Sequence, residues 1–236
     1  MFAPAPVFDA LTAAGISALT FAVSARVVWI SRRFVPATAG RAAVALGGWI
    51  VFTGALAASG LLARTDLVPP PAALLIVSVL TLAIATGLSP AGGALAAAVP
   101  LRMLVGLQAF RMPLEVVMHR AAGLGIMPPE LSYSGYNLDI VTGASALALA
   151  LTMRAGIAVP RALVWAWNLW GLWCLAVIAA IAVATSPMVR AFGDDPRHVN
   201  TWVLHLPYVW LPAVLVFIAL AGHVVTTRAL LMHRRA

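Results

Sequence analysis

Lysine is missing from this sequence: all fifteen basic residues are arginine. Retinal photoreceptors hold their chromophore on a lysine Schiff base, so that class is excluded, together with any enzyme that needs such a lysine. Cysteine occurs once, as Cys174 inside an apolar run. A single cysteine cannot form a disulfide within the chain or a cysteine-based metal site. We therefore interpret Cys174 as a small core residue.

Charged residues are also scarce, at 9% of 236 residues, whereas 63% are hydrophobic. A soluble domain carries roughly a quarter charged residues. The composition therefore predicts an all-helical integral membrane protein whose main partner is the lipid bilayer. The formal charge of +8 does not indicate a nucleic-acid partner, because the arginines stand singly or in pairs at the ends of apolar runs. Arginines so placed are typical of topology signals and headgroup anchors.

Seven apolar runs are long enough to cross a bilayer core about 30 Å thick. The first lacks a basic amino-terminal region and carries Asp9, which favours a retained span over a cleaved signal peptide. We predict one domain over residues 1–236, a bundle of seven transmembrane helices. The predicted spans are residues 6–30, 42–63, 70–89, 97–122, 139–157, 161–185 and 205–231.

Arginine placement predicts the orientation, because cytoplasmic connections carry the basic excess. With the amino terminus outside, nine arginines fall at cytoplasmic ends: Arg32, Arg33, Arg41, Arg102, Arg154, Arg161, Arg228, Arg234 and Arg235. Four fall at outer ends: Arg64, Arg120, Arg190 and Arg197. This predicts an outer amino terminus and a cytoplasmic carboxyl terminus in a multi-pass protein of a bacterial-type cell membrane. A re-entrant fourth segment would invert everything after it.

Polar residues concentrate in the fourth segment, where Gln108, Arg111, Glu115 and His119 follow spacings of three, four and four. At about 100° per residue, all four share one helix face. Ionisable groups on a spanning helix are costly and usually face the bundle interior. Pro113 lies among them and should kink the helix or free a carbonyl group. We call Gln108, Arg111, Glu115 and His119 the polar stripe.

The polar stripe allows several roles. Arg111 and Glu115, four residues apart, would pair as a structural ion pair. Glu115 and His119 would alternatively share a metal ion or form a carboxylate–imidazole proton relay. If a metal binds, His205 is the expected third ligand. Arg111 would also supply a fixed positive charge for a carboxylate or phosphate group.

Further polar residues are predicted to meet the stripe in the outer half of the membrane. They are Tyr133, Asn137 and Asp139 before the fifth span, and His205 and Tyr208 at the start of the seventh. Together they would line an outward-facing cavity if the fourth, fifth and seventh spans are neighbours. Asp139 has an alternative role as the N-cap of the fifth helix. His223 continues the polar face of the seventh span inward.

Three functions fit this pattern. The first is a protein whose outer cavity binds or transports a small polar or anionic ligand, with kinked helices providing a pathway. The second is a membrane-embedded hydrolase, with Glu115, His119, Asp139 and His205 acting either as acid–base groups or as ligands of one metal ion. The third is an accessory subunit or homo-oligomer whose polar face meets partner helices. The sequence leaves open whether the protein is an enzyme.

Overall fold

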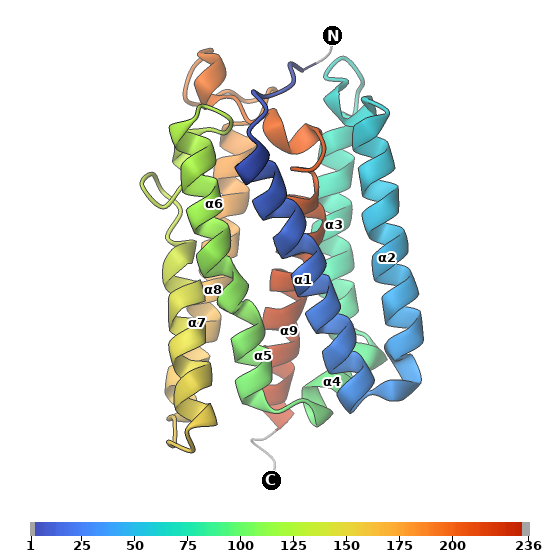
Figure 1. Cartoon of the computed structure of the whole chain (residues 1–236), viewed down its shortest axis with the longest axis vertical. Coiled ribbons are helices and arrows are strands. Elements are labelled where there is room, and N and C mark those ends of the chain that lie inside the picture. Colours follow the sequence, from blue (N-terminus) through green and yellow to red (C-terminus); the bar gives the residue numbers. More distant parts are fainter. Residues whose placement is uncertain (1–2, 233–236) are drawn as a thin grey trace.

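The computed structural model describes residues 3–232, and the regular secondary structure in that range is entirely helical. The long helices lie side by side as one bundle, with the chain running up and down between its two ends (Figure 1). The first helix begins at one end and the last helix finishes at the other (Figure 1). Arg234 and Arg235, counted above for the orientation, lie outside the described residues.

Within residues 3–232, five helices are long and apolar enough to cross a membrane. A sixth span results if the bent pair Pro90–Ala98 and Leu101–Gly123 is taken as one. The protein is therefore a helical protein built for several membrane crossings, and the count of seven stays a prediction. The five helices are α1 Ala10–Phe34, α2 Pro36–Ala58, α3 Pro71–Leu88, α8 Arg161–Ala184 and the last helix, Leu211–Met232.

A capping side chain sets the start of the first helix, and a proline sets the start of the second. Asp9 caps α1 by accepting hydrogen bonds from the backbone and hydroxyl of Thr12, so this helix begins at residue 10 and not at 6. Pro36 opens α2, six residues before the predicted start, because proline is well suited to the first helical position. Gly60, with a φ of 74°, follows the end of α2, which is earlier than predicted.

The segment between α3 and α7 contains two breaks. The short helix α4, Pro90–Ala98, makes an angle of 117° with the following segment and lies across one end of the bundle (Figure 1). The fourth span therefore begins at Leu101 instead of residue 97, with α5 Leu101–Leu107, a 3₁₀ turn Gln108–Phe110 and α6 Arg111–Gly123. The 3₁₀ turn lies where Pro113 cannot donate to the carbonyl of Ala109.

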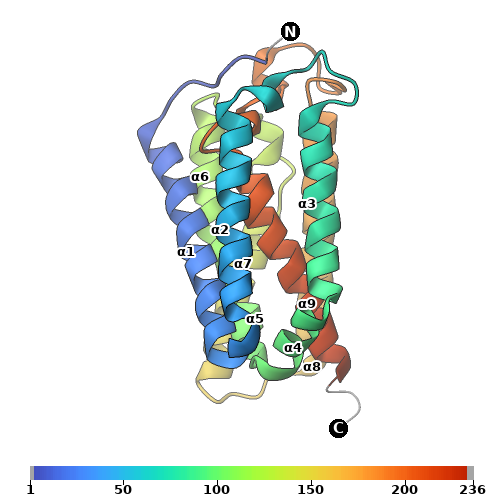
Figure 2. The ribbon, with the colours of Figure 1, turned by 90° about the vertical axis from the view of Figure 1, so that its right-hand side faces the viewer.

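The last helix begins at Leu211, six residues later than predicted. Its first part, Leu211–Val216, is a π-helical turn containing Pro212, and α9, Phe217–Met232, follows. This helix runs obliquely through the bundle (Figure 2) and packs against α3, α4, α5 and α8. The fourth segment also packs against α7, Asp139–Arg154, so the fourth predicted span neighbours both the fifth and the seventh.

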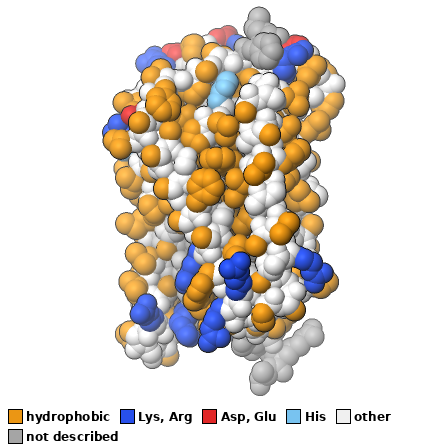
Figure 3. Space-filling view, turned by 45° about the vertical axis from the view of Figure 1, so that its right-hand side comes forward, with side chains coloured by type: hydrophobic (Ala, Val, Ile, Leu, Met, Phe, Trp, Pro, Cys, Tyr) orange, Lys and Arg blue, Asp and Glu red, His pale blue; other side chains and the backbone are white. Residues whose placement is uncertain are grey.

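Charge is distributed unequally between the two ends of the bundle. Arginines gather at the end where α1 finishes, and acidic side chains appear at the opposite end (Figure 3). At that opposite end each described arginine pairs with an aspartate, in the pairs Arg64–Asp66, Arg120–Asp9, Arg190–Asp194 and Arg197–Asp195. The Arg120 guanidinium holds the pKa of Asp9 well below its usual range. Among the described residues, the arginine excess therefore lies toward the carboxyl-terminal end of α1.

Helices α6 and α7 approach each other so closely at Gly143 that no side chain fits there. A Cβ at this position would clash with the backbone nitrogen of Met112 and lie 2.9 Å from the carbonyl carbon of Arg111. Backbone atoms cannot move aside as a flexible side chain can. The glycine therefore sets the distance between the two helices that carry Arg111 and Asp139.

We predict that Gly143→Ala destabilises the protein by about 1–3 kcal/mol, the usual cost of overpacking a tight interface. The measurement is thermal unfolding of purified protein in detergent. Gly47→Ala in α2 is the matched control, because a Cβ there meets no atom within 4 Å. The control should unfold at the wild-type temperature or slightly above it. Equal unfolding temperatures for the two variants would contradict the close approach of α6 and α7.

Candidate functional site

Three of the four residues of the polar stripe face the bundle interior. Gln108, Arg111 and Glu115 are each at most 1% exposed. His119 is exposed, because it lies at the edge of the buried face of α6, on which Met118 and Ala121 are buried beside it. The helical periodicity therefore predicted the direction of the first three side chains correctly, and the fourth lies outside the buried group.

Arg111 pairs with Asp139 on α7. Its Nε group donates to Oδ2 of Asp139, its Nη2 group is in ion-pair contact with Oδ1, and both side chains are almost fully buried. The expected pairing of Arg111 with Glu115 is thus replaced by a contact between helices. Asp139 does not cap α7, whose N-cap is Leu138 without a side-chain hydrogen bond. The aspartate instead neutralises the arginine inside the bundle.

His223 on α9 extends this ion pair toward α8. The Nη1 group of Arg111 lies 2.8 Å from Nε2 of His223, and His223 Nδ1 lies 2.9 Å from Oδ1 of Asn168. Arginine can only donate, so Nε2 accepts and Nδ1 carries the proton. Asn168 Nδ2 then donates to Thr227 Oγ1 at 2.8 Å, and Thr227 donates to the carbonyl oxygen of His223 at 3.0 Å. The imidazole is held as one neutral tautomer.

Space for the imidazole comes from Gly171 on α8. A Cβ there would clash with the His223 ring. The Trp167 ring, one turn away, lies 5.3 Å from the imidazole centroid, and its Nε1 donates to the carbonyl oxygen of Thr142 at 3.2 Å. The carbonyl oxygen of Gly171 also lies 3.5 Å from Nη2 of Arg111. Helix α8 therefore contributes a wall of the site, although none of its residues was a predicted site residue.

Glu115 is held by the connection that precedes α7. Asn137 donates from Nδ2 to Glu115 Oε1 at 2.8 Å and to the carbonyl oxygen of Leu131 at 3.0 Å. Oδ1 of Asn137 accepts from the backbone N–H of Asp139 at 3.0 Å. Asn137 thus links Glu115 to the start of α7. We call Gln108, Arg111, Glu115, Asn137, Asp139, Asn168 and His223 the polar cluster.

Apart from Oδ1 of Asp139, which is in ion-pair contact with Arg111, two acceptor atoms of the polar cluster are buried without a hydrogen-bond donor among the described residues. They are Oε2 of Glu115 and Oε1 of Gln108. Gln108 uses its amide nitrogen to donate to the carbonyl oxygen of Ala219 at 3.1 Å. Leaving a buried acceptor unpaired costs about 1–3 kcal/mol. The polar cluster therefore has spare capacity to accept hydrogen bonds and little spare capacity to donate them.

The remaining predicted site residues lie apart from the polar cluster. His119 stacks on Tyr133 with ring centroids 4.4 Å apart, and its Nδ1 lies 3.1 Å from the hydroxyl of Ser132. Tyr208 is buried against Trp202, and His205 is half-buried. No hydrogen bond or ion pair between described side chains joins them to Glu115 or Arg111. These residues form the end of the bundle above the cluster.

No group of three or more histidine, cysteine, aspartate or glutamate side chains within residues 3–232 is arranged to hold a metal ion. In particular, Glu115, His119 and His205 do not gather into such a group. Glu115 is buried and hydrogen-bonded to Asn137, whereas His119 is exposed and bonded to serine hydroxyls. A shared metal or a direct relay between Glu115 and His119 therefore has no support in this arrangement.

Comparisons with known proteins assign a family without a function. Residues 68–231 match the family described as Domain of unknown function (DUF8737), and the chain belongs to that family. No curated protein matches the chain, and neither does any solved structure. The matched region begins before α3 and ends within α9, so it contains the whole polar cluster.

We predict that Arg111→Met destabilises the protein by about 3–5 kcal/mol, because it leaves the buried Asp139 carboxylate unpaired. The double variant Arg111→Met/Asp139→Leu should regain most of this loss, since neither charge then remains alone. Thermal and denaturant unfolding in detergent measure both effects. Arg120→Met, which breaks a partly exposed pair with Asp9, should change stability little. A double variant as unstable as the single one would contradict the assignment.

Proposed function

We propose that this family member is a seven-span membrane protein that binds a small polar, hydrogen-bond-donating ligand at the polar cluster. The ligand would enter from the outer side of the membrane. The family description names no activity, so the proposal rests on the site itself. One observation carries it: two acceptors without donors, on Glu115 and Gln108, lie buried on either side of Arg111 on the same helix.

Buried ionisable groups inside a membrane bundle usually mark a substrate or ion site, because holding them there is costly. A purely structural role would require only the Arg111–Asp139 ion pair, in which each charge neutralises the other. Glu115 adds a third ionisable group and receives a single hydrogen bond from Asn137. A donor ligand would satisfy Oε2 of Glu115 and recover the free energy lost by leaving it unpaired.

An anionic ligand fits the same geometry less well. Arg111 is the only described cation in the cluster, and its Nε, Nη1 and Nη2 groups already contact Asp139, His223 and the carbonyl of Gly171. An incoming carboxylate or phosphate would have to displace Asp139, whose own charge would then be unpaired. The unpaired acceptor oxygens of the site favour ligands with hydrogen-bond donors, such as ammonium or amide N–H groups.

The backbone around the cluster also favours binding. Helix α7 has sixteen residues, about 24 Å at 1.5 Å per residue, which is shorter than a bilayer core of about 30 Å. The irregular segment before it, which carries Ser132 and Asn137 as buried residues, would complete the crossing. Non-helical backbone at membrane depth occurs where protein buries it or where it lines a cavity, and such breaks accompany transporter binding sites.

The charge distribution supports the proposed orientation. The end of the bundle with the arginine excess includes Arg32 and Arg33 in the last turn of α1, Arg102 in α5, Arg154 in the last turn of α7 and Arg228 in α9. The seven acidic residues of the sequence all lie elsewhere. Cytoplasmic segments carry the basic excess, so this end would be cytoplasmic and the amino terminus outside. An odd number of crossings agrees with the opposite positions of the first and last helix ends (Figure 1).

We predict that small donors stabilise the purified protein and that small anions do not. Methylammonium, guanidinium and urea serve as donor probes, and acetate and phosphate as anion probes, in a thermal-shift assay in detergent. A donor at 100 times its Kd should raise the Tm by about 5 °C. Glu115→Gln should abolish this rise. The substitution removes the negative charge, and with the amide oxygen kept on Asn137 it puts an NH₂ group in place of the unpaired acceptor oxygen.

Glu130→Gln is the matched control, since Glu130 contacts His198 at the outer end, away from the cluster. This variant should respond to the probes as wild type does. If only acetate or phosphate stabilised the protein, the ligand would be an anion and not a hydrogen-bond donor. No shift of wild type with any donor, or an equal shift in Glu115→Gln, would overturn the proposal.

A second prediction tests the orientation with the single native cysteine removed by Cys174→Ala. In that background Asp194→Cys should react with a membrane-impermeant maleimide in intact spheroplasts of the expression host. Ala158→Cys, at the opposite end of the bundle, should react only after permeabilisation. Both positions are exposed, so access to the reagent is limited by the membrane alone. The reverse pattern would place the amino terminus inside, and labelling of both in intact spheroplasts would contradict an odd number of crossings.

A further inference from the structure

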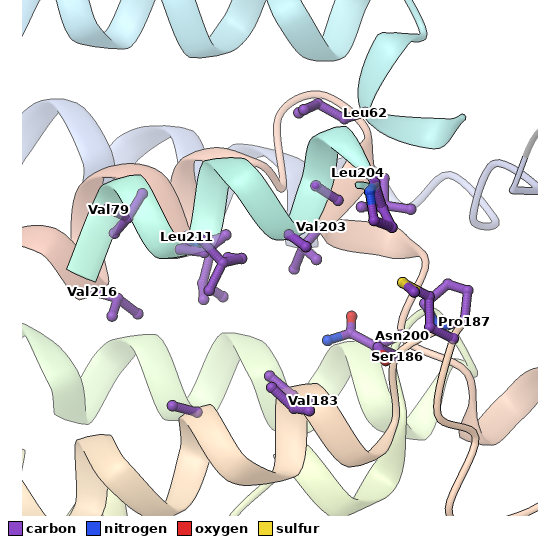
Figure 4. Close-up of a pocket in the computed structure, with 18 of the residues that line it drawn as sticks. Leu62, Val79, Val183, Ser186, Pro187, Asn200, Val203, Leu204, Leu211 and Val216 are labelled. Carbon is purple, nitrogen blue, oxygen red and sulfur yellow. The ribbon is translucent and has the colours of Figure 1, made fainter. Parts of the chain in front are cut away.

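A cavity lies between α3 and α8, and none of the residues of the polar cluster lines it. Its volume is about 370 Å³, within the usual range for sites that hold small molecules. The two helices both pack against α9, and side chains from the last helix, including Leu211 and Val216, form the back of the cavity. Figure 4 shows Val79 of α3 and Val183 of α8 on opposite sides of this space.

The cavity opens toward the lipid-facing side of the bundle. Val77 on α3 and Val183 on α8 both line it, and they are 62% and 56% exposed. These exposed valines lie within helices that are apolar enough to cross a membrane. The hydrocarbon chains of the bilayer therefore have direct access to the cavity from the side.

Polar atoms gather at one end of the cavity, in the connection between α8 and the last helix. Asn200 is 6% exposed, and its side chain points into the space between Val183 and Val203 (Figure 4). Its Oδ1 has no hydrogen-bond partner among the described residues, and neither has Nε1 of the buried Trp202, which also lines the cavity. One is an acceptor and the other a donor.

We propose that this cavity binds a lipid with one hydrocarbon chain and a neutral hydroxyl head. The chain would lie against Val79, Leu211 and Val216, with the hydroxyl at Asn200 and Trp202. A hydroxyl group both donates and accepts, so it would satisfy the free Asn200 oxygen and the free Trp202 N–H together. A saturated hydrocarbon would leave both polar atoms unpaired.

The cavity favours one chain because its volume is near the lower limit for small-molecule sites. Its wall also reaches the neighbourhood of the polar cluster. Met118, one turn after Glu115 on α6, lines the cavity, and so does Leu131, whose carbonyl oxygen accepts from Asn137. The bound chain would therefore pack against the elements that hold Glu115.

The test uses full-length protein in phosphatidylcholine vesicles and hexadecanol carrying a photoactivatable diazirine on its chain. Crosslinked peptides, identified by mass spectrometry, should come from the facing sides of α3 and α8. Unlabelled hexadecanol should compete, and hexadecane should compete poorly. Asn200→Ala should reduce the preference for the alcohol over the hydrocarbon about fivefold, the effect of one hydrogen bond.

Ala179→Phe should abolish the crosslinks, because Ala179 lines the cavity and a phenyl ring would fill it. Ala180→Phe, at the adjacent exposed position, controls for the added ring and should label as wild type does. If Ala179→Phe does not fold, competition by hexadecanol against hexadecane in wild type still decides. Crosslinks spread over all lipid-facing helices, or equal competition by both compounds, would overturn the proposal.

Discussion

The buried ion pair between Arg111 and Asp139 is the contact on which the interior of this bundle depends. It joins α6 to α7, and Arg111 extends it to α9 through His223. Two close approaches make the pair possible: Gly143 lets α7 reach α6, and Gly171 leaves room for the imidazole. A charge held at this depth needs its partner within contact distance, so the positions of four helices are tied to one guanidinium group.

Much of this arrangement could be read from the sequence, and the reason is periodicity. The spacing of Gln108, Arg111 and Glu115 fixes a common face, because an α-helix turns by a constant angle per residue. His119 follows the same spacing but is exposed, although Met118 and Ala121 beside it on α6 are buried. Periodicity gives the direction of a side chain; it does not say how wide a sector of the helix surface the neighbouring helices cover.

Partners across helices were the part that the sequence could not supply. Local spacing favoured Glu115 as the partner of Arg111, whereas the structure pairs Arg111 with Asp139, twenty-eight positions away. Asn168 looked like one polar residue among tryptophans, and its contact with His223 depends on how α8 packs against α9. Pro113 was informative about a break in the fourth span, but the π-helical turn at Pro212 and the late start of the last helix required knowledge of the packing.

The hydrogen bonds that leave Arg111 toward the arginine-rich end all point the same way. Arg111 donates to His223, His223 to Asn168, Asn168 to Thr227, and Thr227 back to a backbone carbonyl oxygen. Arginine can only donate, so the first member of this row fixes the donor and acceptor of every hydrogen bond that follows it. The row therefore has a single polarity, and no member can turn over without breaking the bond to its neighbour.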